Sequence, residues 1–146
     1  MTFPSLTSFD DADLRGLGYR VLRVSVFDHW LSAEEAAECP VMNHALALRA
    51  GALDAYEAGE ARFLALYDGM ALTGVTDAQG PLCPATAART IRDSLREVTL
   101  MDIRFPELAL RAVGGWDRTD LLLLEPAADL DALTARIRRH GLFVLP

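Results

Sequence analysis

Asp28, His29, Cys39 and His44 form the densest group of reactive side chains in this chain of 146 residues. All four are residue types that ligate metals, and a zinc ion would need three or four of them to converge at about 2.0–2.3 Å. Their spacing fits no compact zinc pattern, and neighbours such as Asp28 and His29 point to opposite faces if they lie on a strand. We therefore expect no metal site, and interpret residues 26–44 as a corner between a strand and the following helices.

Cys39 and Cys83 are the candidate nucleophiles, and either thiol would need a histidine base within hydrogen-bonding reach. No spacing in the sequence brings one of the three histidines to either cysteine. The sequence thus predicts no converging catalytic set, and catalytic residues stay unassigned.

The stretch "GPLCPATAAR" is a candidate anion site, because a Gly/Pro loop there leads into a helix N-terminus. Thr86 can cap that helix, and Arg89, Arg92 and Arg96 recur at helical spacing as a basic stripe. A small anionic ligand would bind at Thr86 and this stripe. The alternative is a solvated helix face neutralised by Asp93 and Glu97.

Two further clusters have structural explanations. "GGWDRTD" places Arg118 between Asp117 and Asp120 at the tip of an expected hairpin, where a binding loop and ordinary turn chemistry look alike. Three arginines and a histidine lie within residues 136–140, at an expected helix C-terminus where cations complement the helix dipole.

The composition excludes several classes of protein. Lysine is absent and all fourteen basic residues are arginine, as is typical of GC-rich bacterial genomes. Without a lysine amine the chain cannot form a Schiff base with pyridoxal phosphate or build a P-loop, and no cofactor is assigned. The net charge of −7 makes nucleic acid and anionic membranes poor partners unless arginines gather on one face.

The sequence favours a cytoplasmic location. Its longest aliphatic run, Leu121–Leu124, is far shorter than the ~20 residues of a spanning helix. Residues 1–13 lack the basic end and apolar region of a signal peptide, and two cysteines suit free thiols in a reducing compartment. The hydrophobic fraction of 51% suggests either an efficient core or an apolar face that a partner covers, and the second alternative favours self-association.

Apolar periodicity and turn residues predict five helices and seven strands. The helices are expected over residues 8–16, 33–38, 43–59, 85–97 and 129–140. The strands are expected over residues 19–27, 61–67, 70–75, 98–105, 108–113, 119–126 and 142–146. Helices and hairpins are mixed along the chain, which predicts one α+β domain over residues 1–146, with a mostly antiparallel mixed sheet and helices packed on it.

The expected hairpin over residues 61–75, with its turn at Asp68-Gly69, is the clearest local signal. Its sequence, "ARFLALYDGMALTG", is similar to the second and third strands of GCN5-type acetyltransferases. In that family an R/Q-x-x-G-x-G/A loop grips the acyl-CoA pyrophosphate, whereas here Gln79 and Gly80 are adjacent. The resemblance implies acyl transfer from coenzyme A, with the pyrophosphate on the loop before Thr86 and Arg89.

Three hypotheses about function follow. The first is a small non-catalytic binding, regulatory or adaptor domain that acts as a homodimer, with its ligand unidentified. The second is the acetyltransferase-like enzyme that binds acyl-CoA. The third is a nucleic-acid-binding protein that uses the helix face of Arg89, Arg92 and Arg96.

Overall fold

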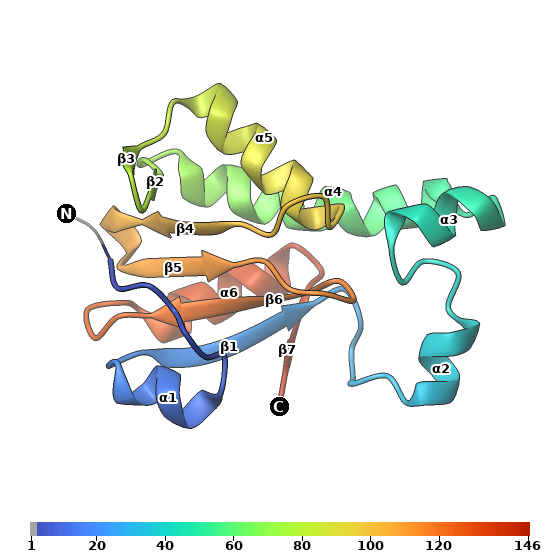
Figure 1. Cartoon of the computed structure of the whole chain (residues 1–146), viewed down its shortest axis with the longest axis horizontal. Helices are drawn as coiled ribbons and strands as arrows, with labels where there is room; N and C mark the ends of the chain where they lie inside the picture. The colour runs from blue at the N-terminus through green and yellow to red at the C-terminus, as the bar shows by residue number, and fades with distance from the viewer. Residues whose placement is uncertain (1–2) are drawn as a thin grey trace.

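The computed structural model describes residues 3–146, in which helices pack on a seven-stranded antiparallel sheet (Figure 1). The strand order is β3-β2-β4-β5-β6-β1-β7. The strands are β1 (Arg20–Ser25), β2 (Thr76–Asp77), β3 (Gly80–Pro81), β4 (Asp102–Phe105), β5 (Leu110–Val113), β6 (Thr119–Leu124) and β7 (Phe143–Leu145). The helices are α1 (Asp11–Gly16), α2 (Ala33–Glu38), α3 (His44–Ala50), α4 (Leu53–Ala71), α5 (Pro84–Leu95) and α6 (Leu130–Arg139), with a short 3₁₀ turn, η1 (Pro106–Leu108). The predicted α+β class is confirmed.

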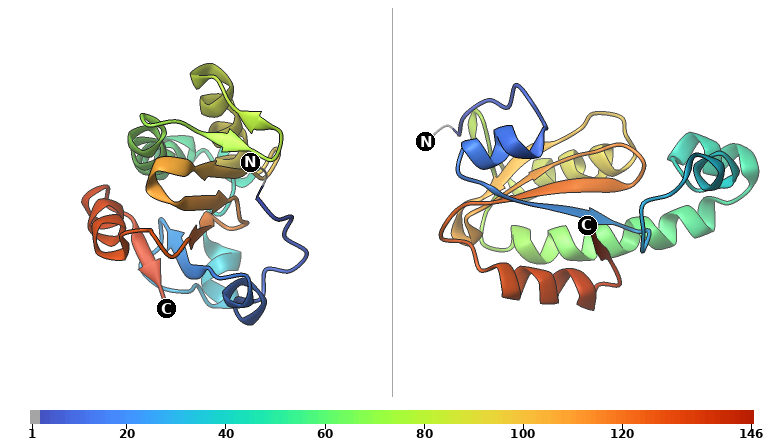
Figure 2. Two further views of the ribbon diagram at one scale, coloured as in Figure 1. Left: turned by 90° about the vertical axis from the view of Figure 1, so that its left-hand side faces the viewer. Right: turned by 90° about the horizontal axis from the view of Figure 1, so that it is seen from below.

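One face of the sheet carries the main core, which α4, α5 and α6 cover (Figure 2). Phe63 and Tyr67 of α4, Ile91 of α5 and Ile137 of α6 pack there against the sheet. Met101, Ile103 and Phe105 also face this core, as their alternation predicts. The helices therefore bury a continuous apolar layer on one side only.

The position of β6 follows from its run of leucines. Leu122 and Leu124 join the main core, whereas Leu121 and Leu123 belong to a second cluster on the opposite face. A strand that is buried on both sides needs covered neighbours, and β6 lies between β5 and β1. The leucine run is thus accounted for by an inner strand that is covered on both faces.

The opposite face, called the open face below, has much thinner cover. Its cluster comprises Leu14 of α1 together with the sheet residues Tyr19, Val21, Val113, Leu121 and Leu123, and Leu6 of the N-terminal segment. Figure 1 shows this segment and α1 near one end of the strands, and α2 beyond the other end. The middle of the open face lies between these two covers.

The expected hairpin over residues 61–75 is wrong, because residues 53–71 form the single helix α4. Tyr56, Phe63, Tyr67 and Met70 of this segment are buried at intervals of three, four and seven residues, which is the helical period. Asp68-Gly69 lies inside the helix, so tertiary packing of that apolar face outweighs the turn tendency of the dipeptide. The strands that carried the acetyltransferase resemblance are absent from this segment.

Two glycines explain the other difference in this region. The expected helix over residues 43–59 is broken at Gly51, which adopts a left-handed conformation with φ of 68° and ends α3. Gly59 does not end a helix but lies within α4. A Cβ there would overlap the guanidinium of Arg118, so glycine is kept for close packing rather than as a helix stop.

The β5–β6 hairpin is confirmed, but its two glycines do not form the turn. The turn spans Trp116–Thr119, with Asp117 and Arg118 at φ values of 57° and 60°. Gly114 and Gly115 lie before the turn, where a Cβ would overlap Ser94 Oγ and the Thr119 carbonyl oxygen respectively. Their small size lets the loop that displays Trp116 lie close to the sheet.

We predict that Gly114→Ala lowers the free energy of unfolding by about 1–3 kcal/mol, because the added methyl group displaces Ser94 from its close contact. Ser94 Oγ accepts a hydrogen bond of 3.0 Å from the Met101 amide, and this bond would also be strained. Gly16→Ala is the matched control, since nothing lies within 4 Å of its added Cβ. Urea denaturation of both variants measures the difference, and equal stabilities would contradict the packing argument.

Candidate functional site

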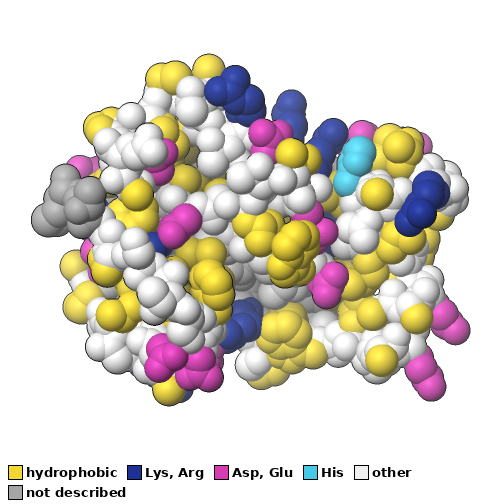
Figure 3. All heavy atoms as spheres, in the orientation of Figure 1, with side chains coloured by type: hydrophobic (Ala, Val, Ile, Leu, Met, Phe, Trp, Pro, Cys, Tyr) yellow, Lys and Arg dark blue, Asp and Glu magenta, His cyan; other side chains and the backbone are white. Residues whose placement is uncertain are grey.

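A groove of about 440 Å³ crosses the middle of the open face. It is lined by Leu6, Phe9, Arg23, Trp30, Leu100, Met101, Asp102, Val113, Gly114, Gly115, Trp116, Thr119, Asp120 and Leu121. Its volume lies in the range of small-molecule sites, and its lining is mostly apolar. Figure 3 shows hydrophobic side chains reaching the surface over the middle of this face.

Three exposed aromatic residues converge on this groove from distant parts of the chain. Phe9, Trp30 and Trp116 are 57%, 49% and 62% exposed, and Trp30 and Trp116 are the only tryptophans of the protein. Large aromatic side chains gain much by burial, so their joint exposure at one hollow indicates a surface meant to be covered.

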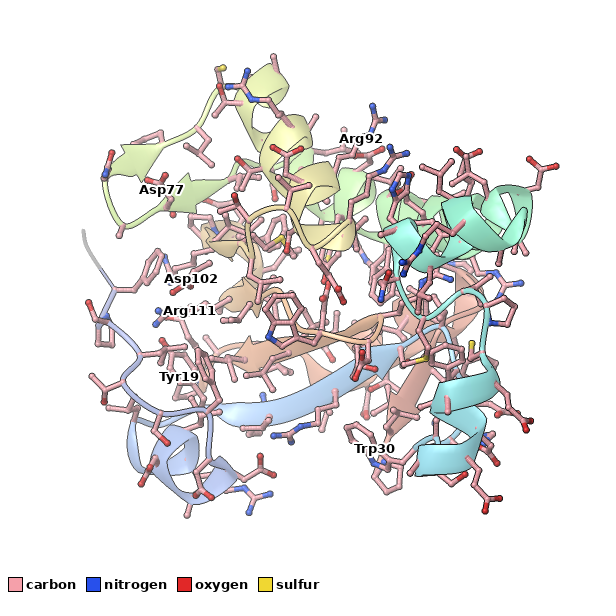
Figure 4. The ribbon with its side chains drawn as sticks, turned by 45° about the vertical axis from the view of Figure 1, so that its right-hand side comes forward. Tyr19, Trp30, Asp77, Arg92, Asp102 and Arg111 are labelled. Atoms are coloured by element: carbon pink, nitrogen blue, oxygen red, sulfur yellow. The ribbon has the colours of Figure 1, made fainter. Side chains whose placement is uncertain are left out.

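The first wall of the groove is the N-terminal segment, which a buried arginine holds in place. Arg111 is 1% exposed and binds both carboxylate oxygens of Asp102 at 2.7 Å. It also donates to the Pro4 carbonyl at 2.7 Å and to the Tyr19 hydroxyl at 3.1 Å, under the ring of Phe3. Burial lowers the pKa of Arg111, but the bonds to Asp102 and Tyr19 outweigh this and raise the pKa above its usual value. Figure 4 shows Asp102, Arg111 and Tyr19 in a row along this end of the sheet.

The second wall is the loop that carries Trp30 between β1 and α2. The Trp30 indole N–H donates to the Pro146 carbonyl at 2.8 Å, which ties this loop to the C-terminal residue. Nearby, His29 bridges Asp28 and Glu35 at 2.6 and 2.7 Å, and these two bonds raise the pKa of His29, that with Asp28 most strongly. Glu35 also accepts from the Ser32 amide in a capping box that starts α2, as the sequence predicts.

Behind the groove, Asp120 is buried between the two faces of the sheet. Its Oδ2 accepts a hydrogen bond of 2.6 Å from the Tyr67 hydroxyl, and its Oδ1 accepts one of 3.1 Å from the Gly115 amide. Burial raises the pKa of Asp120 to about 6, although both hydrogen bonds oppose this shift. Because both oxygens have partners inside the protein, Asp120 anchors the β5–β6 loop.

Arg118 holds the same loop from the other side. Its guanidinium stacks 4.1 Å from the Tyr56 ring centre and donates to the Tyr56 carbonyl at 2.7 Å. Burial lowers the pKa of Arg118, because its charge lies in the protein interior. Asp117, Arg118 and Glu97 all have positive φ, and the Asp117 amide donates to Glu97 at 2.8 Å. Strained backbone is thus concentrated beside Trp116, as is common at functional surfaces.

Arg23 is the basic residue of the groove lining. It lies on β1 opposite Leu121 of β6 and Leu145 of β7, and its side chain is 28% exposed. Its Nη2 lies 2.6 Å from Oδ1 of Asp11 in α1. The ion pair with Arg23 is the main cause that lowers the pKa of Asp11. An arginine therefore lines a groove whose lining is otherwise mostly apolar.

The group Asp28, His29, Cys39 and His44 does not converge. Asp28 and His29 lie beyond the end of β1 and contact each other, so the alternation expected for residues on a strand does not apply to them. Cys39 ends α2, and His44 packs edge-on against Tyr56 with ring centres 5.4 Å apart. Residues 3–146 hold no group of three or more histidine, cysteine, aspartate or glutamate side chains placed to bind a metal ion.

The proposed anion-binding residues are separated by their contacts. Thr86 lies in the first turn of α5, where its hydroxyl is 3.1 Å from Cys83 Sγ, and hydrogen bonding between the two groups is the main cause that lowers the pKa of Cys83. Arg89 and Arg92 are exposed, and Figure 4 shows Arg92 on the outer side of α5. Arg96 is bound through two nitrogens to Glu60 at 2.7 and 2.9 Å. The basic stripe therefore offers two exposed arginines rather than three.

Sequence reasoning missed the groove. Phe9, Trp30 and Trp116 lie more than twenty residues apart in sequence and on three different loops, so no local spacing relates them. The available signal was the alternation in β1, which places Arg23 on the same side of the strand as Val21 and Ser25. A charged residue between Val21 and Ser25 on one side of a strand indicates that this side is not fully covered.

Comparisons of the chain with protein-family models, curated proteins and solved structures find no match. Over the part of the chain that the structure describes, no helix is both long enough and apolar enough to cross a membrane. The chemistry of the groove itself is therefore the basis for assigning a function.

We predict that Glu35→Gln lowers the pKa of His29, because glutamine keeps the capping box but removes one of the two carboxylates that stabilise the imidazolium. The bridge stabilises the fold below the ordinary histidine pKa of about 6.5, and this contribution is lost as pH rises through the raised pKa. NMR titration of the imidazole C–H resonances, with His29 assigned from His29→Gln, measures the shift. An unchanged His29 pKa in Glu35→Gln would show that the bridge does not form in solution.

We predict that Asp120 makes folding pH-dependent between about pH 4 and 6. Its pKa is about 6 in the folded protein and about 3.9 in an unfolded chain, so the folded state binds the proton more tightly. The contribution of Asp120 to the free energy of unfolding is therefore greatest below pH 4. It falls, by on the order of 2–3 kcal/mol, as pH rises through 6. Asp120→Asn should remove this component, and the exposed Asp117→Asn should keep it. Denaturation curves at several pH values that run parallel for wild type and Asp120→Asn would refute the assignment.

Proposed function

We propose that this protein is a small non-catalytic binding protein, and that the groove on its open face binds an apolar ligand with an aromatic ring. The observation that carries this proposal is the convergence of Phe9, Trp30 and Trp116, all about half exposed or more, on one groove. Aromatic rings prefer offset-stacked or edge-to-face contact with other rings, and three of them can enclose a flat ligand.

The polar groups around the groove favour binding over catalysis. Asp102 and Asp120, the two carboxylates of the lining, have both oxygens bonded inside the protein. A general acid or base needs an atom that can form a hydrogen bond with the substrate. The carboxylate oxygens of Asp102 and Asp120 already bind groups of the protein. The two walls are tied down by Arg111 and Trp30, so the groove is held open in the unliganded protein, which lowers the cost of binding.

A second copy of the chain is the competing occupant, because self-association is expected from the apolar composition. A symmetric dimer requires a self-complementary patch, whereas this surface is a hollow with exposed rings at its rim. The hollow shape therefore favours a small ligand.

We expect saturable binding of N-phenyl-1-naphthylamine, a neutral aromatic probe whose emission rises in an apolar site. Excitation of the protein should give energy transfer to the probe, since both tryptophans line the groove. Trp116→Ala should weaken binding about tenfold, equivalent to about 1.4 kcal/mol of lost aromatic contact. Leu72→Ala is the matched control, because Leu72 is 87% exposed and lies outside the groove lining.

Two outcomes would refute the proposal. One is a probe signal that does not saturate or that is equal in Trp116→Ala and Leu72→Ala. The other is a dimer in light scattering that Trp116→Ala dissociates, which would assign the groove to a second copy.

A further inference from the structure

Arg23 differs from the three arginines of this protein that each bind a carboxylate through two nitrogens. Arg96, Arg104 and Arg111 each bind a carboxylate through two nitrogens, Nε and Nη2. Arg23 contacts its carboxylate through one nitrogen, at 2.6 Å, within the part of the chain that is described. A guanidinium has five N–H donors, and paired donors match a carboxylate best. Two guanidinium nitrogens therefore contact a carboxylate at three sites, whereas one nitrogen of Arg23 does so.

The partner of Arg23 is also shared. Asp11 Oδ1 lies 2.6 Å from Arg23, while its Oδ2 lies 3.6 Å from Nη2 of Arg15. One carboxylate thus serves two guanidinium groups, and Arg15 remains beside Asp11 if Arg23 turns to another anion. The exchange of one carboxylate for another at Arg23 would leave Asp11 with a positive neighbour.

Arg23 is the charged residue of the lining that can bind a charged group of a ligand, because the two carboxylates of the lining already have partners. Asp102 is held by Arg111, and Asp120 by Tyr67 and Gly115. Arg23 lies between Leu121 and Leu145 at the floor, below the aromatic rings of the rim. The groove therefore combines aromatic contact with one incompletely used guanidinium.

We propose that the ligand of this groove is a small aromatic carboxylate, whose ring lies among Phe9, Trp30 and Trp116 and whose carboxylate binds Arg23 in place of Asp11. This inference rests on the proposed binding function and adds the charge of the ligand. The net charge of −7 repels anions at long range, so the preference must arise from this contact. Arg23 then binds the ligand carboxylate, and Asp11 competes with that carboxylate for Arg23.

Displacement of N-phenyl-1-naphthylamine by 2-naphthoate and by 2-naphthamide tests this inference, because the two competitors share a ring system and differ in charge. We expect wild type to bind 2-naphthoate about tenfold more tightly than 2-naphthamide. Arg23→Gln should abolish this preference.

Asp11→Asn should raise the affinity for 2-naphthoate about threefold and leave that for 2-naphthamide unchanged, since the competing carboxylate is gone. Arg49→Gln, at an exposed arginine of α3 outside the groove lining, is the charge control and should behave as wild type.

The outcomes separate this inference from the proposed function. Equal affinities for the two competitors, unchanged in Arg23→Gln, would show that the ligand does not bind through a carboxylate. Binding of the neutral probe would in that case still support the proposed function of the groove. Weaker binding of 2-naphthoate in Asp11→Asn would overturn the competition between Asp11 and the ligand. Tighter binding of N-acetyl-glycyl-tryptophan than of 2-naphthoate would assign the groove to the C-terminus of a peptide. Absence of any probe binding would remove the proposed function itself.

Discussion

The ion pair of the buried Arg111 with Asp102 determines how the open face of the sheet is covered. A guanidinium that is 1% exposed needs a partner for its charge and acceptors for its remaining donors. Asp102 supplies the first, and Tyr19 and the Pro4 carbonyl supply the second. Because one of these acceptors belongs to the N-terminal segment, pairing the charge also fixes that segment across the strands.

The groove is a consequence of this incomplete cover. Three helices cover the other face with one continuous apolar core, whereas the open face receives only α1, the N-terminal segment and the loop of Trp30. These elements lie toward the two ends of the strands and leave Arg23, Val113 and Leu121 at the floor between them. A solvated sheet face normally carries polar side chains, whereas this lining mixes leucine and valine with one arginine.

Much of the fold could be predicted from the sequence because its signals are local. The four leucines of β6 indicate burial on both faces, and Ser32 and Glu35 specify the start of α2 through their own hydrogen bonds. The segment over residues 61–75 failed because Asp68-Gly69 resembles a turn, while the helical period of Phe63, Tyr67 and Met70 becomes decisive only once these residues pack on the sheet. Local turn tendency and long-range packing disagree there, and packing decides.

The candidate site could not be predicted for the converse reason, since its residues are related only through the sheet. Phe9, Trp30 and Trp116 lie on separate loops, and the register of β1 with β6 and β7 places Arg23 between leucines on the floor beneath them. The reactive types that stood out in the sequence are instead used for structure: His29 bridges two carboxylates and Arg96 holds Glu60. Such contacts remove these groups from chemistry with a substrate. The groove presents aromatic surface and the guanidinium of Arg23, and the proposed binding function rests on these groups.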